Sequence, residues 1–244
     1  MTSLRFGSVL VVELTPPPDP PCRYCQVLAA DARPASRTHF SVPAATARAV
    51  LQRIERGASV DAVVLGGGGE PLRQIGVGSI CRKVRREAHL STIVLTDGTL
   101  LGDREVRREL ADADTVVAWL PALQERAEGG GPGPAAVTAR ANAWERHVEG
   151  IASLRRETQV RIALEIPVFP GRNDGAESRD AWKRAARRIR PDRVFVIPDP
   201  RAKQDTSAVL EEVRDGIHSK AGAYLPDGTV VDRRCGCGAE DEED

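Results

Sequence analysis

The segment at residues 61–72, DAVVLGGGGEPL, joins a buried strand to a glycine-rich turn. Ala62–Leu65 is a short apolar run without polar alternation, which is typical of a strand that is covered on both faces. Four glycines end this strand, and Glu70 and Pro71 follow them directly. A glycine run is usually a tight strand-to-helix turn, and the Glu-Pro pair behind it favours a functional role as well.

The same unit, a short apolar strand followed by a helix, recurs along the whole chain. Such repeats predict an α/β protein with a parallel sheet covered by helices. Right-handed crossovers then give either an open doubly wound sheet or a full or partial β/α barrel. We expect strands at 8–14, 62–65, 92–95, 115–120, 160–168 and 194–197, and helices at 42–57, 72–88, 103–110, 138–156, 176–189 and 205–218.

The composition narrows the class of protein. The 244 residues carry 35 basic and 35 acidic side chains, so the net charge gives no general attraction to nucleic acid or to an anionic membrane, and nucleic acid is not an expected partner. No apolar run is long enough to span a bilayer, and the N-terminus lacks a signal-peptide pattern, so we expect a cytoplasmic protein. Without export, the five cysteines favour metal binding or redox chemistry over a disulfide framework.

Several unusual residues directly follow the predicted strands. Function collects at the carboxyl ends of the strands in both candidate architectures. We therefore expect one rim of the sheet to carry Cys22 and Cys25 after the first strand, Gly66–Gly69 and Glu70 after the second, Asp97 after the third and Asn173 after the fifth.

The order of these motifs resembles the radical S-adenosylmethionine (radical SAM) superfamily. The motifs are a CxxC with an aromatic residue, Tyr24, before its second cysteine, then GGEP after the second strand, then Thr-Asp-Gly after the third. The resemblance covers roughly residues 8–201 and implies a partial (β/α)6 TIM-like barrel. It also implies a 4Fe–4S cluster and S-adenosylmethionine, in which an electron from the cluster cleaves a carbon–sulfur bond to yield an adenosyl radical.

The resemblance assigns roles to particular residues. Cys22 and Cys25 would be metal ligands, and Tyr24 would lie beside the adenine. Gly68 and Gly69 would let the backbone approach the methionine part of the cofactor closely, and Glu70 would receive its ammonium group. Asp97 is a further cofactor-binding candidate on the same rim. The substrate is not indicated, and a protein partner or an electron donor is possible.

The sequence departs from the family pattern at two places. The family has a first cysteine four residues before the second, whereas this chain has Pro18, which has no ligand atom in its side chain. After the fourth strand, where relatives often carry Ser-x-Asp, the chain has Trp119, Leu120 and Pro121.

The missing ligand could come from the C-terminal segment. We expect one domain at 1–220, and at 221–244 a tail with a hairpin or added strand (223–231), two cysteines and an acidic end. Cys235 or Cys237 could complete the cluster, as could Asp19 or a partner. Alternatively Cys22, Cys25, Cys235 and Cys237 could form a four-thiolate zinc site.

Two other functions stay open beside a radical SAM enzyme. One is a degenerate paralogue that lost the radical chemistry and acts as a binding or scaffold protein, with structural zinc as an option. The other is a nucleotide-binding enzyme with a doubly wound sheet, which is weaker because prolines follow the first strand where G-x-G-x-x-G would be needed. Away from these motifs, Cys81 is expected to be a core residue and His147 a surface or capping residue.

Overall fold

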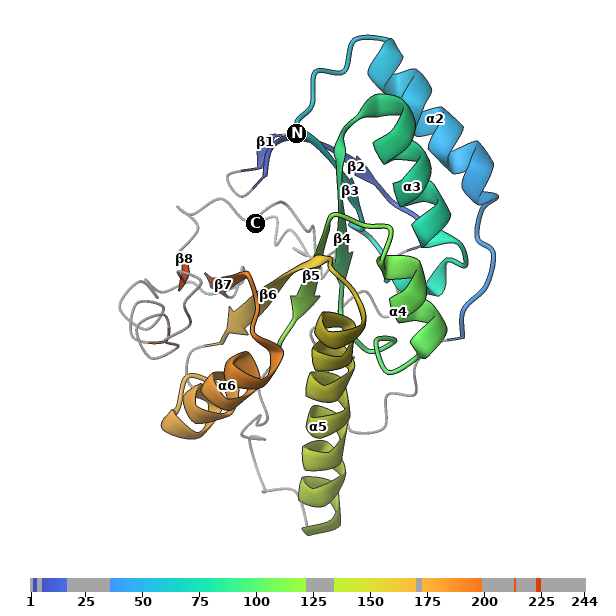
Figure 1. Cartoon of the computed structure of the whole chain (residues 1–244). Helices are drawn as coiled ribbons and strands as arrows, with labels where there is room; N and C mark the ends of the chain where they lie inside the picture. Colours follow the sequence, from blue (N-terminus) through green and yellow to red (C-terminus); the bar gives the residue numbers. More distant parts are fainter. Residues whose placement is uncertain are drawn as a thin grey trace, which may run out of the picture.

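The computed structural model describes residues 2–3, 6–16, 36–121, 134–169, 173–198, 213 and 223–224. Its centre is one sheet in which the strands follow one another in chain order (Figure 1). The parallel strands are β2 (Gly7–Val12), β3 (Ala62–Leu65), β4 (Ser91–Thr96), β5 (Thr115–Trp119), β6 (Arg161–Val168), β7 (Arg193–Pro198) and β8 (Ala223–Tyr224), and β1 (Thr2–Ser3) pairs antiparallel with β2.

The sheet is an open, partial barrel. Among the strands that the structure describes, none joins the β8 edge back to β2. Consecutive helices pack against one another, as expected when every crossover has the same hand and places its helix on the same side of the sheet (Figure 1). These helices are α2 (Pro43–Glu55), α3 (Val77–Ala88), α4 (Arg104–Leu110), α5 (Pro134–Glu157) and α6 (Ala176–Ile189), with a short 3-10 helix, η1 (Pro71–Arg73), before α3.

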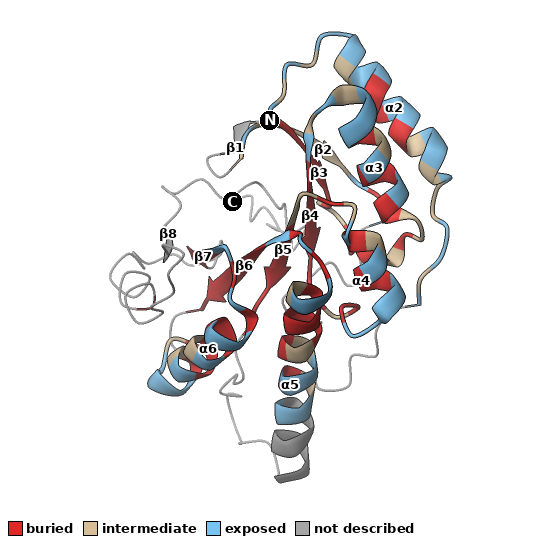
Figure 2. Ribbon diagram, viewed as in Figure 1, coloured by how far each residue is buried: buried red, intermediate tan, exposed pale blue. Residues whose placement is uncertain are grey.

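Alternation along the strands separates the core into two parts, because successive side chains point to opposite faces of a sheet. Val63, Leu65 and Val94 belong to the larger part, which lies between the sheet and the helices. Val64 and Ile93 belong to the smaller part, on the concave face. The strands are buried along most of their length, while the helices expose their outer sides (Figure 2). Of the helices in the described part of the chain, none is long and apolar enough to cross a membrane.

The six predicted parallel strands are all confirmed, with ends that differ by at most two residues. The single helix predicted at 72–88 is wrong, because η1 and α3 are separate. Gly76 has a φ of +90°, and the segment before it pairs with the chain entering α2. Ile75 donates its N–H to the Thr38 carbonyl at 3.0 Å, and the amide of Gln74 bonds both the N–H and the carbonyl of Ser41. These tertiary hydrogen bonds replace the helical ones.

Other boundaries also differ from expectation. Helix α5 begins at Pro134, four residues before the expected start at 138, and β1 was not expected. Residues 223–224 form the added strand that was one of two alternatives for 223–231. The rest of that segment, the boundary at 220 and nearly all of the helix expected at 205–218 lie outside the described residues.

The contact between α3 and α4 gives a test of the packing. A Cβ added to Gly78 would overlap the carbonyl oxygen of Glu109 in α4. Alanine is favoured over glycine in a helix by about 1 kcal/mol, but overpacking against backbone costs about 1–3 kcal/mol. We expect Gly78→Ala to lower the free energy of unfolding in urea by about 1–2 kcal/mol.

Gly102→Ala is the matched control, because a Cβ there meets nothing within 4 Å. It should change stability by less than about 0.5 kcal/mol. Equal stability of the two variants would contradict the close α3–α4 contact.

Candidate functional site

The glycine run leaves β3 in a conformation that favours glycine. Gly66 has a φ of +143° and Gly67 a φ of +129°, values that side-chain-bearing residues rarely adopt. A Cβ on Gly66 would also lie 3.0 Å from the Cβ of Leu95 on the neighbouring strand. The backbone of the run is therefore turned sharply at the carboxyl end of β3, beside the end of β4.

Gly69 packs against the chain that leaves β2. A Cβ at this position would overlap the carbonyl oxygen of Pro16 and the hydroxyl oxygen of Thr15. The Thr15 hydroxyl donates a hydrogen bond to the Glu70 carbonyl at 3.2 Å, and both residues are buried. The glycine run and the start of the segment that carries the cysteine pair are thus in direct contact.

The side chain of Glu70 joins the carboxyl ends of β3 and β4. One carboxylate oxygen accepts from the Leu72 N–H at 3.0 Å and from the Thr96 hydroxyl at 2.8 Å, and the other accepts from the Asp97 N–H at 2.7 Å. Glu70 is 8% exposed, so these bonds form in a poorly hydrated environment, where leaving a polar group unpaired is costly. The Thr96 hydroxyl in turn accepts from the Gly98 N–H at 2.9 Å.

The turn after β4 is held by its own side chains and by α5. Asp97 accepts hydrogen bonds from the N–H and the hydroxyl of Thr99, at 2.9 and 2.7 Å. Gly98 has a φ of +82°, and a Cβ there would overlap the ring of His147. Asp97 is therefore buried and fixed on the rim, directly beside Glu70.

His147 connects this turn to the end of β5. Its Nε2 donates to the carbonyl oxygen of Trp119 at 2.7 Å. Burial lowers the pKa of His147, and the bond to Trp119 and the charge of Asp97 oppose that shift less strongly. The sequence favoured a surface or capping role for His147. However, it lies three residues after Trp144 and four before Ile151, on the buried side of α5. This helical spacing could have indicated a packed position.

A buried pair of side chains lies on the concave face. Trp119 of β5 donates its indole N–H to a carboxylate oxygen of Glu165 on β6 at 3.0 Å, and each residue is 1% exposed. The two residues are opposite one another in the ladder. Sequence reasoning did not select Glu165, although an acidic residue within the apolar strand RIALEIPV was a usable signal.

The described candidates from the sequence come together as expected. Gly68, Gly69 and Glu70 follow β3, Asp97 follows β4, and Asn173 folds back on the end of β6, where its amide bonds the Phe169 N–H and the Pro167 carbonyl. Cys22, Tyr24, Cys25, Cys235 and Cys237 lie outside the described residues, as do Pro18 and Asp19.

Metal-ligating groups are sparse in the described part of the chain. Within it, no cluster of three or more His, Cys, Asp or Glu side chains could hold a metal ion. Cys81 is buried, and burial raises the pKa of its thiol to about 12. Such a thiol is a poor ligand and nucleophile, because the thiolate is the reactive form. The expectation that Cys81 is a core residue is confirmed.

More than half of the chain matches one known protein family. The radical SAM superfamily matches residues 20–180, which span both the cysteine pair and the glycine run. The chain belongs to the radical SAM superfamily. Members of this superfamily generally use a 4Fe–4S cluster and S-adenosylmethionine.

Solved and curated relatives are distant. The radical SAM fold also occurs in a radical SAM methyltransferase from Sphaerobacter thermophilus, with a TM-score of 0.53 and 17% identity over 74% of this chain and 55% of that one. The protein named GTPase Obg from Brachyspira hyodysenteriae is 22% identical over 92% of this chain and 32% of its own length. UPF0026 protein slr1464 from Synechocystis sp. is 34% identical over 42% of this chain and 38% of its own length. The chain therefore spans about a third of the length of these two curated relatives.

Replacing Glu70 by glutamine tests whether its carboxylate holds the two turns together. In Glu70→Gln, either orientation of the amide places an NH2 group against one backbone N–H, that of Leu72 or that of Asp97, which then loses its acceptor. We expect a loss of about 1–3 kcal/mol in the free energy of unfolding, measured in urea. Glu55→Gln, on the exposed end of α2, should change it by less than about 0.5 kcal/mol. A Glu70→Gln variant as stable as wild type would refute the bridging role.

The lowered pKa of His147 predicts that the stability of the protein depends on pH. Its pKa is lowered from 6.5 in the folded protein, so below pH 6.5 the unfolded chain binds a proton that the folded chain does not. Stability should therefore fall as the pH drops below about 6.5, by at most about 1.4 kcal/mol per pH unit from this group, and this contribution should be flat above it.

The contribution of His147 is isolated by His147→Gln, which removes the titration while an amide N–H can still reach the Trp119 carbonyl. Urea unfolding between pH 5 and 7.5 should show a smaller slope in this variant than in wild type. His39→Gln, which alters an exposed histidine, should keep the wild-type slope. A wild-type slope in His147→Gln would assign the pH dependence to other groups.

Proposed function

We propose that this radical SAM protein is an enzyme that binds an iron–sulfur cluster and S-adenosylmethionine at the carboxyl ends of its strands. The observation that carries the proposal is the contact of Thr15 and Pro16 with Gly69 and Glu70. Cys22 follows Pro16 by six residues, so it can reach no further than roughly 20 Å from the glycine run. The segment that leads to the cysteine pair and the glycine run with Glu70 are thus in contact at the rim, and the chemistry needs both.

For the cluster, we assign Cys22 and Cys25 as thiolate ligands. Pro18 cannot supply the third, so Cys235, Cys237 or a protein partner would complete the site. The described residues hold no competing cluster of metal-binding side chains, and the only cysteine among them, Cys81, is buried in the core.

For the cofactor, the described rim fits the methionine end of S-adenosylmethionine. The glycine run presents backbone without side chains, so Gly68 and Gly69 would let a ligand approach closely. The ligand would reach Gly69 from the side away from Pro16 and Thr15, which occupy the position that its Cβ would take. Glu70 would accept the ammonium group and at the same time fix the run, through its bonds to Thr96 and Asp97. Tyr24 would lie beside the adenine.

When bound together, the cluster and S-adenosylmethionine supply a carbon-centred radical for modification of the substrate. The described residues would keep that chemistry away from water. Trp119 and Glu165 are buried and hydrogen-bonded to each other on the concave face, and Val117 and Ile197 lie in the apolar layer of the same face. A dry interior of this kind protects a reactive intermediate from side reactions.

A degenerate paralogue is the second candidate, and one specific feature favours it. Trp119, Leu120 and Pro121 replace the polar residues that relatives often carry after the fourth strand, and all three are buried. Such a protein would keep the barrel as a binding or scaffold unit, with structural zinc as an option.

GTP hydrolysis, which the name of the Brachyspira relative includes, is not proposed. The phosphate-binding loop of such enzymes ends in Gly-Lys, and no lysine in this chain follows a glycine.

Anaerobic reconstitution separates the candidates. After purification without oxygen and incubation with iron and sulfide, a radical SAM enzyme should hold about four irons and four sulfides per chain. Cys22→Ala and Cys25→Ala should each abolish the cluster, because each removes a thiolate from a site that is already short of one. Glu70→Ala should keep the cluster and weaken S-adenosylmethionine binding in calorimetry by about 1.5–3 kcal/mol.

Cys81→Ala is the matched control and should retain both the cluster and the cofactor affinity. Stoichiometric zinc without a cluster would select the structural-zinc alternative. A folded protein that binds neither metal nor S-adenosylmethionine would reject the enzyme and leave the scaffold role.

A further inference from the structure

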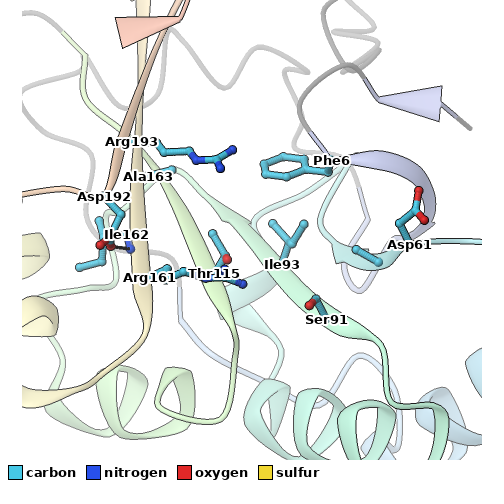
Figure 3. A pocket seen from close by; sticks show the side chains of 11 residues that line it. Phe6, Asp61, Ser91, Ile93, Thr115, Arg161, Ile162, Ala163, Asp192 and Arg193 are labelled. Atoms are coloured by element: carbon cyan, nitrogen blue, oxygen red, sulfur yellow. Dashed lines mark hydrogen bonds between the residues drawn. The ribbon is translucent and has the colours of Figure 1, made fainter. Parts of the chain in front are cut away.

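A hollow lies at the amino ends of the strands, opposite the end that carries the glycine run (Figure 3). The sheet register explains which side chains meet there. Thr115 pairs with Ile93 on one side and with Arg161 on the other, and Arg193 pairs with Ala163. Residues that stand opposite one another in a ladder point to the same face of the sheet. Ile93 and Ala163 belong to the apolar layer of the concave face, so Thr115, Arg161 and Arg193 also face that side.

The inner wall of the hollow is apolar. Ile93, Ala62 and Ala163 are buried there, and Phe6 packs edge-on against Phe195 with ring centroids 6.0 Å apart. The volume is about 240 Å³, slightly below the range of about 300–1,000 Å³ typical of drug-sized ligands. The space equals roughly eight liquid-water volumes, so it suits a ligand the size of one ring with one substituent.

Two arginines provide positive charge at the mouth. Figure 3 shows Arg193 and Phe6 projecting into the hollow from opposite sides. Within the part of the chain that the structure describes, no hydrogen bond or ion pair joins the side chain of Arg193 to another residue. Among the described residues, the side chain of Arg161 makes one long hydrogen bond of 3.4 Å, from Nε to the Asp114 carbonyl, which leaves its terminal nitrogens available. Thr115 and Ser91 add hydroxyl groups to the lining.

The two acidic residues of the lining are occupied by the protein itself. Asp192 accepts from the Ile162 N–H at 2.7 Å and forms an ion pair with Arg155. Asp61 accepts from the Ser8 N–H at 2.8 Å, on the Phe6 side of the hollow (Figure 3). Asp61 keeps its negative charge, because its partner is a neutral N–H, but it lies on the Phe6 side. On the side of Arg193 and Arg161, Asp192 is ion-paired with Arg155, so the charge that remains there is positive.

We propose that this hollow binds a small organic anion, with its carboxylate or phosphate group on Arg193 and Arg161 and its apolar body against Phe6 and Ile93. The guanidinium fork matches both oxyanions, whereas the apolar wall favours an anion with a ring or short chain over an inorganic ion. The site lies at the other end of the strands from the proposed cofactor site and does not depend on the proposed function.

Calorimetric titration of the full chain with phenyl phosphate and with benzoate tests the proposal. At least one should bind, and the stronger of the two identifies the oxyanion. Benzamide has the ring without the charge and should bind at least about tenfold more weakly, and so should inorganic phosphate, which has the charge without the ring. Because no cluster or cofactor is needed, failure here leaves the proposed function untouched.

Substitutions locate the binding. Arg193→Gln should weaken the preferred anion by about tenfold or more, because a charge-assisted bond is lost, and Arg161→Gln should act in the same direction. Arg53→Gln, on the exposed side of α2, is the matched control and should bind as wild type. Circular dichroism establishes that each variant is folded.

Three results would overturn the proposal. They are no binding of either aromatic anion at 10 mM, equal binding of benzamide, and unchanged affinity in both folded arginine variants.

Discussion

The buried carboxylate of Glu70 is the constraint on which the rim of the sheet depends. Taking a carboxylate out of water is unfavourable unless its oxygens are hydrogen-bonded. Here one oxygen accepts from Leu72 and Thr96 and the other from Asp97, so the turns after β3 and β4 are tied to a single side chain. Movement of either turn would leave buried polar groups unpaired, and this couples the two turns into one unit.

The backbone around Glu70 fixes the position of the glycine run relative to β2. Thr15 donates to the carbonyl of Glu70, and Gly69 has no room for a side chain beside Pro16. The strand end that leads to the cysteines is therefore packed on the turn that leads to Glu70. In the radical SAM superfamily the cluster and its cofactor must meet, and this contact is the local geometry that would bring them together.

The carboxyl and amino ends of the strands carry side chains of different chemistry, although side chains alternate between the two faces of the sheet in the same way at both ends. At the carboxyl ends, polar groups such as Asp97 and Asn173 are satisfied by neighbouring backbone, which holds the turns still. At the amino ends, Arg161 and Arg193 stand on the concave face with little internal pairing. Rigid, satisfied groups suit the positioning of a reactive cofactor, whereas unpaired cations suit the capture of an anion.

The strands, the glycine turn and the family follow from the sequence alone, because apolar runs such as AVVL and motifs such as GGEP depend on local chain chemistry. The sequence did not predict the break between η1 and α3, because that break comes from the pairing of Gln74 and Ile75 with a distant segment. Nor did it predict the bond between Trp119 and Glu165, or the hollow beside Arg193. Those features require knowing which residues of neighbouring strands stand opposite one another, and this register is set only when the sheet assembles.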